Sequence, residues 1–306
     1  MFSRLVIAAA ASASMVTGAM AWDGARANHL RPENFTDISL TATFIHLQGT
    51  VDLGLGPETS TLGIGVLAPS YHRTFDAFGN VGAVLIGIPV GTVSFETSAG
   101  TVDIDTPIAQ GDMYIGGSFG LLGMPSLSPQ EYFMHKPDGP QVSAEAKLFL
   151  PTGDYDSDRM VSLGQNRWSL QASLPITYVL GDTMLDPNLM TFEVRPVVQI
   201  FGDNDDAVGP AEVMSQDPIF GIEGHITRNF GNSIWAGLDG YYEIGGETSY
   251  DGFAQGDALE SLSVGATLGI VFSPSLAMRL SYRELVYSNV PDSSGRTFEL
   301  TSAFLF

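Results

Sequence analysis

The sequence WSLQASLPITY, residues 168–178, alternates strictly between apolar and polar side chains. Its even positions, from Trp168 to Tyr178, are apolar or aromatic, whereas its odd positions carry Ser, Gln, Pro or Thr. A period of two residues is the pattern of a β-strand with one apolar and one polar face. An aromatic residue stands at each end of the apolar face. This stretch therefore predicts a strand that meets an apolar medium on one side only.

The same alternation returns along the whole chain, for example in MTFEVRPVVQI at 190–200 and in SLSVGATLGIVF at 261–272. Short, turn-like connections between these stretches alternate with longer polar connections. We predict twelve strands, near residues 36–48, 62–74, 79–90, 110–122, 141–151, 166–180, 189–202, 217–229, 232–244, 259–273, 275–288 and 295–306. Most of them have about the 9–11 residues that a tilted strand needs to cross a bilayer.

Alternating strands occur in soluble β-sandwiches and in membrane β-barrels. A sandwich charges its outer face freely, but here the polar faces are mostly Ser, Thr, Gly and Gln. Charged residues make up 15% of the chain, against roughly 25% in a typical soluble domain. Long strands, an even strand count and alternating loop lengths favour a single closed antiparallel transmembrane β-barrel with a polar lumen.

The chain has 306 residues and a formal net charge of −21, with 34 Asp and Glu against 13 Lys and Arg. This acidic balance argues against a nucleic-acid binder, which would carry a basic stripe. The chain has no cysteine, which excludes disulfides, a thiolate zinc site and a cysteine nucleophile. No cofactor is expected.

The N-terminus predicts three parts. Residues 1–21 have the features of a cleaved secretory signal peptide: Arg4, an apolar stretch, and Ala19-Met20-Ala21 before Trp22. Residues 22–34 follow as a periplasmic segment, expected as a disordered tail, with folding into the barrel mouth as the alternative. Residues 35–306 form the barrel.

The chain ends on a strand whose apolar face carries Phe298, Leu300, Phe304 and the terminal Phe306. Such an ending resembles the signal by which outer-membrane barrels are recognised for insertion. It implies the barrel-insertion machinery as a partner through Phe306, together with outer-membrane lipid and lipopolysaccharide. We therefore expect a multi-pass β-barrel, a monomer, in the outer membrane of a Gram-negative bacterium.

One succession of motifs is more specific. PTGDYD at 151–156 is followed by LGQNRW at 163–168, and QGD at 110–112 and GMPSLSPQEYF at 123–133 precede them. The order resembles the outer-membrane family named for the meta pathway of phenol degradation. The resemblance covers nearly the whole mature chain and implies a barrel that passes small organic compounds. That family has no settled functional residues to carry over.

The polar faces of the predicted strands collect charged side chains that would line the lumen. These candidates are Glu145, Lys147, Glu193, Arg195, Glu223, His225, Asp239, Glu243, Arg279, Arg283 and Glu299. Charges in a narrow lumen lose much of their hydration, so ion pairs that join the wall are the favoured interpretation. A polar constriction that selects solutes is the second.

Pro175 and Pro196 lie inside neighbouring predicted strands, where a closed ladder has no use for a residue without N–H. A β-bulge that curves the wall is the favoured explanation. A local gap through which an apolar solute leaves sideways into lipid is the functional alternative.

Two acidic loops suggest calcium ligands, although neither completes a calcium-binding pattern, and solvated loops are favoured. The candidate carboxylates are those of Asp154, Asp156, Asp203 and Asp205.

We expect a passive channel for small organic, aromatic or apolar compounds. The alternatives are a non-conducting structural or adhesive barrel and, less favoured, an outer-membrane enzyme. An enzyme would need a histidine near a serine or a carboxylate, and His225 has Glu223 on its predicted face, but no G-x-S-x-G motif occurs. The connection from Gly123 to Gln141 is too long for a periplasmic turn, and the sequence gives no purpose for it.

Overall fold

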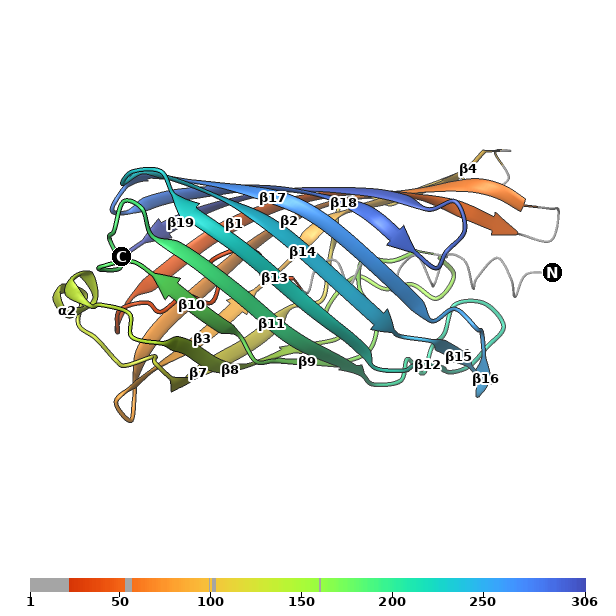
Figure 1. Cartoon of the computed structure of the whole chain (residues 1–306). Coiled ribbons are helices and arrows are strands. Elements are labelled where there is room, and N and C mark those ends of the chain that lie inside the picture. Colours follow the sequence, from red (N-terminus) through yellow and green to blue (C-terminus); the bar gives the residue numbers. More distant parts are fainter. Residues whose placement is uncertain (1–21, 53–56, 99, 101–102, 160) are drawn as a thin grey trace.

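The computed structural model describes residues 22–52, 57–98, 100, 103–159 and 161–306. The predicted signal peptide, residues 1–21, lies outside this part of the chain. The described residues form an antiparallel barrel (Figure 1). The barrel is closed because its first strand pairs with both the second strand and the last one. No described helix is both long and apolar enough to cross a membrane.

Twelve strands span the wall, as the sequence predicts. They are β1 (Thr36–Asp52), β2 (Pro57–Ala77), β3 with β4 (Asn80–Gly87 and Val90–Thr97), β7 (Tyr114–Leu122), β8 (Pro140–Phe149), β9 with β10 (Ser169–Ser173 and Ile176–Leu180), β11 (Met190–Phe201), β13 (Ile219–Asn229), β14 (Ile234–Gly245), β17 (Leu259–Ser273), β18 (Leu276–Ser288) and β19 (Ser294–Leu305). Both β3 and β4 pair with β2, and both β9 and β10 pair with β11, so each pair counts as one interrupted strand.

The two ends of the barrel differ. One end carries the short connections, the C-terminus and the short helix α2 (Pro129–Met134), and the other carries the long loops (Figure 1). The long loops add β5 (Asp103–Asp105) and β6 (Ala109–Gln110) to the edge of β4. They also form a separate small sheet from β12 (Met214–Gln216), β15 (Thr248–Tyr250) and β16 (Phe253–Ala254). Short connections are typical of the periplasmic end of such barrels.

Side chains alternate between lipid and lumen as the period of two requires. On β1, Ile38, Leu40 and Phe44 are exposed on the outer face, and Phe44 lies opposite Phe298 of β19. Asp37, which directly precedes Ile38, is buried on the inner face. An apolar outer belt over a polar interior is the arrangement that a bilayer stabilises.

One predicted boundary is further from the observed one than the others. The strand expected at 79–90 continues to Thr97, so the connection expected at 91–109 is shorter. Pro89 and Gly91 suggested a break, but β2 is 21 residues long and pairs with the chain on both sides of them. Gly91 is required because a Cβ there would lie 2.1 Å from the carbonyl oxygen of Gly65.

Candidate functional site: a segment held inside the lumen

The N-terminal segment, residues 22–35, runs inside the barrel instead of forming the expected disordered tail. The Gly24 amide donates to Glu223 Oε1 at 2.5 Å, and the Arg26 amide donates to Glu193 Oε2 at 2.9 Å. Both acceptors lie on inward faces of wall strands. Leu30 has no exposed surface. Because backbone and side chains are both held, this segment is a built part of the lumen.

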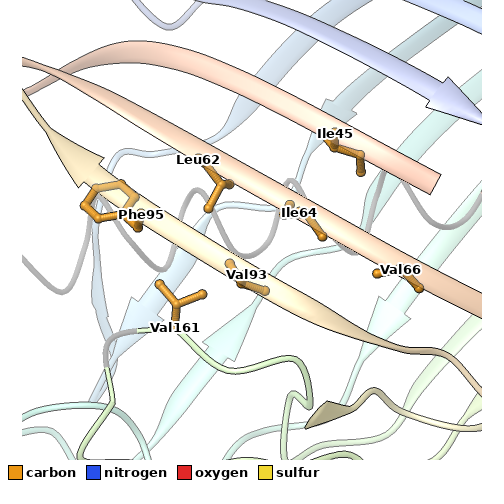
Figure 2. Close-up of a cluster of buried hydrophobic side chains, with 7 residues drawn as sticks. All are labelled: Ile45, Leu62, Ile64, Val66, Val93, Phe95 and Val161. Carbon is orange, nitrogen blue, oxygen red and sulfur yellow. The ribbon is translucent and has the colours of Figure 1, made fainter. Parts of the chain in front are cut away.

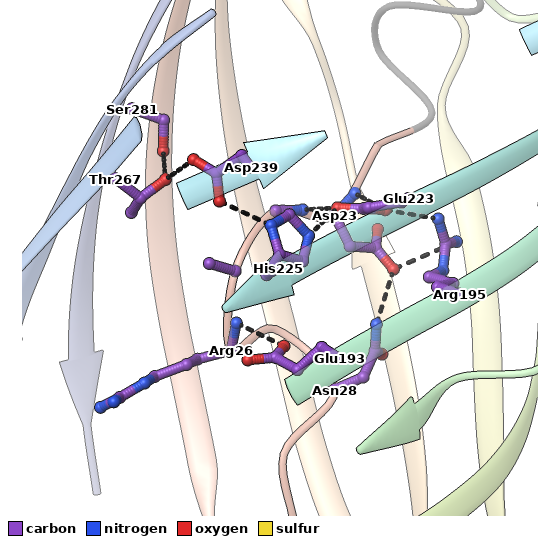
Figure 3. A network of polar contacts seen from close by, with 12 residues as sticks. Asp23, Arg26, Asn28, Glu193, Arg195, Glu223, His225, Asp239, Thr267 and Ser281 are labelled. Atoms are coloured by element: carbon purple, nitrogen blue, oxygen red, sulfur yellow. Dashed lines mark hydrogen bonds and ion pairs between the residues drawn. The ribbon is translucent and has the colours of Figure 1, made fainter. Parts of the chain in front are cut away.

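An ion-pair cluster joins this segment to the wall. Lys147 on β8 and Arg195 on β11 both contact the Asp23 carboxylate, the latter at 3.1 Å. Arg195 also reaches Glu145 at 3.1 Å and Glu223 at 3.2 Å. Figure 3 shows Asp23 together with Arg195 and Glu223 of this cluster. Buried charges need such partners, because moving one ion from water into the protein interior costs on the order of several kcal/mol.

The cluster continues across the next strands. His225 on β13 places Nε2 2.9 Å from Glu223 and Nδ1 2.6 Å from Asp239. Thr267 on β17 donates to Asp239 at 2.7 Å and lies 2.9 Å from Ser281 (Figure 3). The network therefore connects four neighbouring strands, β13, β14, β17 and β18, at one level of the lumen.

Arg26 and His29 make a second attachment, nearer to the periplasmic end. His29 Nε2 lies 2.9 Å from Glu193 Oε1. Arg26 donates to Thr227 and to Asn229, each at 2.7 Å. Its guanidinium also stacks 4.4 Å from the ring centroid of Trp235, a cation–π contact.

The long connection 123–139 forms a clamp at the periplasmic end. Leu30 packs against Val81 of β3 and Met124 of this connection. The Glu33 amide donates to the Leu127 carbonyl at 2.8 Å, and Ser126 donates to the Glu33 carboxylate at 2.7 Å. The connection that the sequence could not explain thus holds the segment where it enters β1.

The helix α2 of this clamp has a capped N-terminus. Ser128 is its N-cap, and Glu131 reaches back to the Ser128 amide at 2.9 Å, which makes a capping box. These hydrogen bonds from Ser128 lower the pKa of the Glu131 carboxyl.

The remaining lumen candidates lie outside the central cluster. Arg279 pairs with Glu299 at 2.9 Å and donates to the Ala25 carbonyl at 3.1 Å. Glu243 accepts from Ser261 at 2.9 Å, and Arg283 lies over the Tyr241 ring at 4.9 Å. The candidate charges therefore knit strands together and do not form one ring.

Part of the lumen is apolar, which corrects the expectation of a uniformly polar interior. At the long-loop end, inward side chains of β1, β2 and β4 form a buried cluster with Val161, which comes from the loop after β8 (Figure 2). The cluster consists of Ile45, Leu62, Ile64, Val66, Val93, Phe95 and Val161. The alternation of apolar and polar residues predicts that every apolar strand face meets lipid. Here a loop folds inward and covers one.

The two prolines do not mark a bulge. Ser173 pairs with Val197 below Pro175, and Ile176 pairs with Val194 above it, which is the same register. Pro196 likewise pairs with Ile222 without a shift. A bulge would add one residue to one strand. At Pro175 the wall strand is interrupted between β9 and β10, but its register with β8 and β11 is the same on both sides.

The motifs of the family resemblance pack together in the long loops. A Cβ on Gly153 would lie 2.6 Å from Gly164 Cα, so the two motif backbones touch. Asp112 accepts from the Gly153 and Gln165 amides, at 2.9 Å each. Burial raises the pKa of Asp112. Nearby, burial lowers the pKa of Arg167, which is 4% exposed, to about 10.

The candidate calcium ligands serve other contacts. Asp154 accepts from the Gln110 amide at 2.6 Å, and Asp156 pairs with Arg159 at 3.0 Å. Asp203 and Asp205 are exposed. No group of three metal-ligating side chains comes together in the described residues.

Sequence reasoning missed the residues of the N-terminal segment that complete the network, above all Asp23, Arg26 and His29. A signal for them existed in the charges. The candidate lumen residues hold six carboxylates against four Lys and Arg, so further cations were needed nearby. Arg26 and Arg31 were the cations available next to the barrel.

A closed twelve-stranded antiparallel barrel with an apolar outer belt has the architecture of an outer-membrane β-barrel. The chain belongs to the family described as "Putative MetA-pathway of phenol degradation", whose model matches residues 35–299. Among curated proteins, no sequence matches the chain.

Solved structures with a similar fold include the COG4313 outer membrane channel from Pseudomonas putida F1. The TM-score is 0.76 at 18% identity, over 93% of this chain and 100% of that one. The translocator domain of the autotransporter NalP from Neisseria meningitidis has a TM-score of 0.49 at 9% identity, over 97% of each chain. The TodX monoaromatic hydrocarbon channel has a TM-score of 0.42 at 9% identity, over 90% of each chain. The last two likenesses are too low to carry an argument.

Proposed function

We propose that this protein is a passive outer-membrane channel for small organic compounds, and that its N-terminal segment sets the width of the passage. The observation that carries the proposal is that wall strands hold the segment inside the lumen and that a cavity remains beside it. Asp23 makes ion pairs with β8 and β11. The backbone of Gly24, Ala25 and Arg26 makes hydrogen bonds with side chains of β13, β18 and β11. A cavity of about 180 Å³ remains between the segment and strands β1, β2, β3, β7 and β8.

The family and the fold support this proposal. The family description refers to phenol degradation, which suggests aromatic solutes. The similar structure from Pseudomonas putida is called an outer membrane channel.

An enzyme is the less favoured alternative. A serine nucleophile is usually activated by a histidine that is hydrogen-bonded to its hydroxyl. In the described residues, His225 is bonded to two carboxylates and His29 to Glu193 instead. A structural or adhesive barrel that acts through its loops is the other alternative.

We also propose that the chain is a monomer in contact with lipopolysaccharide and that the insertion machinery reads its C-terminus. Phe306 exchanges two backbone hydrogen bonds with Thr36, at 2.9 and 3.0 Å. Its side chain is 72% exposed, so the terminal ring is accessible although its backbone closes the barrel.

Liposome swelling with sugars, amino acids and aromatic acids tests the function, together with conductance in planar bilayers. We expect a small conductance and passage of solutes no larger than a single ring. A barrel that is silent in both measurements, and stays silent when residues 22–34 are deleted, would contradict a channel and favour a scaffold.

A further inference from the structure

The luminal cavity beside the N-terminal segment has the size of one aromatic ring. Its volume is about 180 Å³. A protein cavity of about 150 Å³ is known to accept benzene. The cavity is bounded by the segment on one side and by five wall strands on the other, so a ring placed here would lie inside the barrel wall and away from lipid.

The lining is divided into an apolar and a polar part. Apolar contacts come from β3, where Val81, Ala83 and Leu85 face inward, and from Met124. Polar groups come from the facing strands and include Ser70, His72 and Tyr114. A cavity with this division suits a solute that has an apolar body and a single polar group.

His72 is the polar group best placed to recognise a solute. Its Nδ1 lies 3.4 Å from Arg31 Nη1. Arginine can only donate a hydrogen bond, so Nδ1 is the acceptor, and the proton of the neutral ring is on Nε2. No hydrogen bond among the described residues uses Nε2. This N–H group is therefore a donor available to the cavity.

The charges around the cavity disfavour an anion. Its lining includes the carboxylates of Asp23, Asp37 and Glu145, against the cations Arg31 and Lys147. Both cations are already paired, Arg31 with Asp37 at 2.9 Å and Lys147 with Glu145 at 3.1 Å. Arg195, just behind the lining, is likewise held by Asp23 and Glu145. A carboxylate solute would therefore lose its hydration without gaining an unpaired cation in the lining, which is costly.

We propose that this cavity binds one uncharged single-ring compound that carries a hydroxyl or another hydrogen-bond acceptor. The ring packs on Ala83 and Leu85, and the acceptor receives the Nε2–H of His72. The proposal rests on the proposed function, because it names the class of solute that the channel takes up. It also excludes aromatic carboxylates from this site.

Calorimetry on the detergent-solubilised full-length protein tests the site with three probes of similar size, phenol, benzoate and toluene. Phenol is uncharged at neutral pH, because its hydroxyl, like that of the tyrosine side chain, has a pKa of about 10. We expect saturable binding of one phenol and at least about tenfold weaker binding of benzoate, because the benzoate carboxylate would lose hydration without gaining a partner. Equal binding of phenol and benzoate would overturn the assignment to uncharged solutes.

Variants locate the site. Ala83→Phe fills the cavity and should abolish phenol binding, whereas Ala266→Phe adds the same ring on the exposed outer face and should not. His72→Leu should weaken phenol binding by about fivefold, the worth of one hydrogen bond, with no change for toluene. His72→Gln keeps an N–H donor and should restore most of the phenol affinity. Equal phenol binding by the Ala83 and Ala266 variants would refute the site.

Two further measurements keep the outcomes separate. Heat-modified mobility on gels reports whether each variant is folded, and Ser118→Leu fills the same cavity if the Ala83 variant fails to fold. Uptake of labelled phenol by cells that express each variant tests the function itself. Uptake that persists in a folded Ala83→Phe barrel refutes the site but not the channel. Saturable binding without any uptake supports the site and contradicts the channel.

Discussion

The guanidinium of Arg195 on β11 lies 3.1 Å from the carboxylate of Asp23, which belongs to the N-terminal segment. A strand of the barrel wall is thus ion-paired to the segment that narrows the lumen. Arg195 is 3% exposed, so salt in the solvent screens this pair weakly. The position of the segment therefore depends on the buried guanidinium of Arg195.

Replacing Arg195 by Gln should release the segment. The change leaves Asp23, Glu145 and Glu223 buried with one cation fewer, and breaking a buried pair costs about 3–5 kcal/mol. We expect a lower free energy of unfolding in urea and a higher, noisier conductance in planar bilayers. Arg296→Gln is the control, because Arg296 pairs with Glu284 at 3.7 Å on the surface and such pairs contribute at most about 1 kcal/mol. Equal conductance of the two variants would contradict the role of Arg195.

Gly153→Ala should loosen the long loops. Its Cβ would lie 2.6 Å from Gly164, and such overpacking costs about 1–3 kcal/mol. We expect faster tryptic cleavage after Arg159, which lies in the same loop and is exposed. Gly240→Ala is the matched control, since a Cβ there meets no atom within 4 Å. Cleavage at the wild-type rate in the Gly153 variant would show that the motif contact is dispensable.

The clamp at the periplasmic end should weaken in acid. Hydrogen bonds from Ser128 lower the pKa of Glu131 in the folded protein, so the stabilisation is present above the ordinary carboxyl pKa. It is lost as the pH falls through the folded-state value. Amide exchange in residues 128–135 should accelerate on acidification, after correction for intrinsic rates, and Ser128→Ala should show about fivefold faster exchange already at neutral pH. An unchanged exchange rate in the Ser128 variant would remove the capping box from the clamp.

Pro175 and Pro196 allow a test of sideways exit into lipid. We propose that the wall is weakest where the strand made of β9 and β10 is interrupted at Pro175, next to β11. Replacing both prolines by Val supplies two N–H groups and should lower uptake of an apolar aromatic while leaving sugar uptake unchanged. An equal effect on both solutes would exclude the lateral route.

The strand pattern was predictable because a lipid-facing wall imposes the same alternation at every strand. The twelve strands and the inward faces of Glu145 or Glu223 follow from that rule alone. The rule fails where it ceases to apply, as at Leu62, Ile64 and Val66 of β2. These residues are apolar and point inward, because the Val161 loop covers them.

The lumen network was predictable only in part. The wall residues lie at alternate positions of strands, so their faces could be read from the sequence. Asp23 and Arg26 lie in a segment without periodicity, and their contacts are with residues far along the chain, such as Lys147 and Glu193. Local patterns carry no information on such contacts, although the excess of wall carboxylates indicated that cations were needed.

The N-terminal segment continues into β1 at Thr36 without a linker. If the contacts of Asp23 with the wall break, the segment therefore stays attached to the barrel. Its effective concentration near the wall is then on the order of millimolar, as for a short tether. The return of the segment to the wall is intramolecular. The durations of the open and closed states of the channel therefore do not depend on how much protein the membrane holds. A single molecule in a bilayer should consequently show the same opening statistics as a densely populated one.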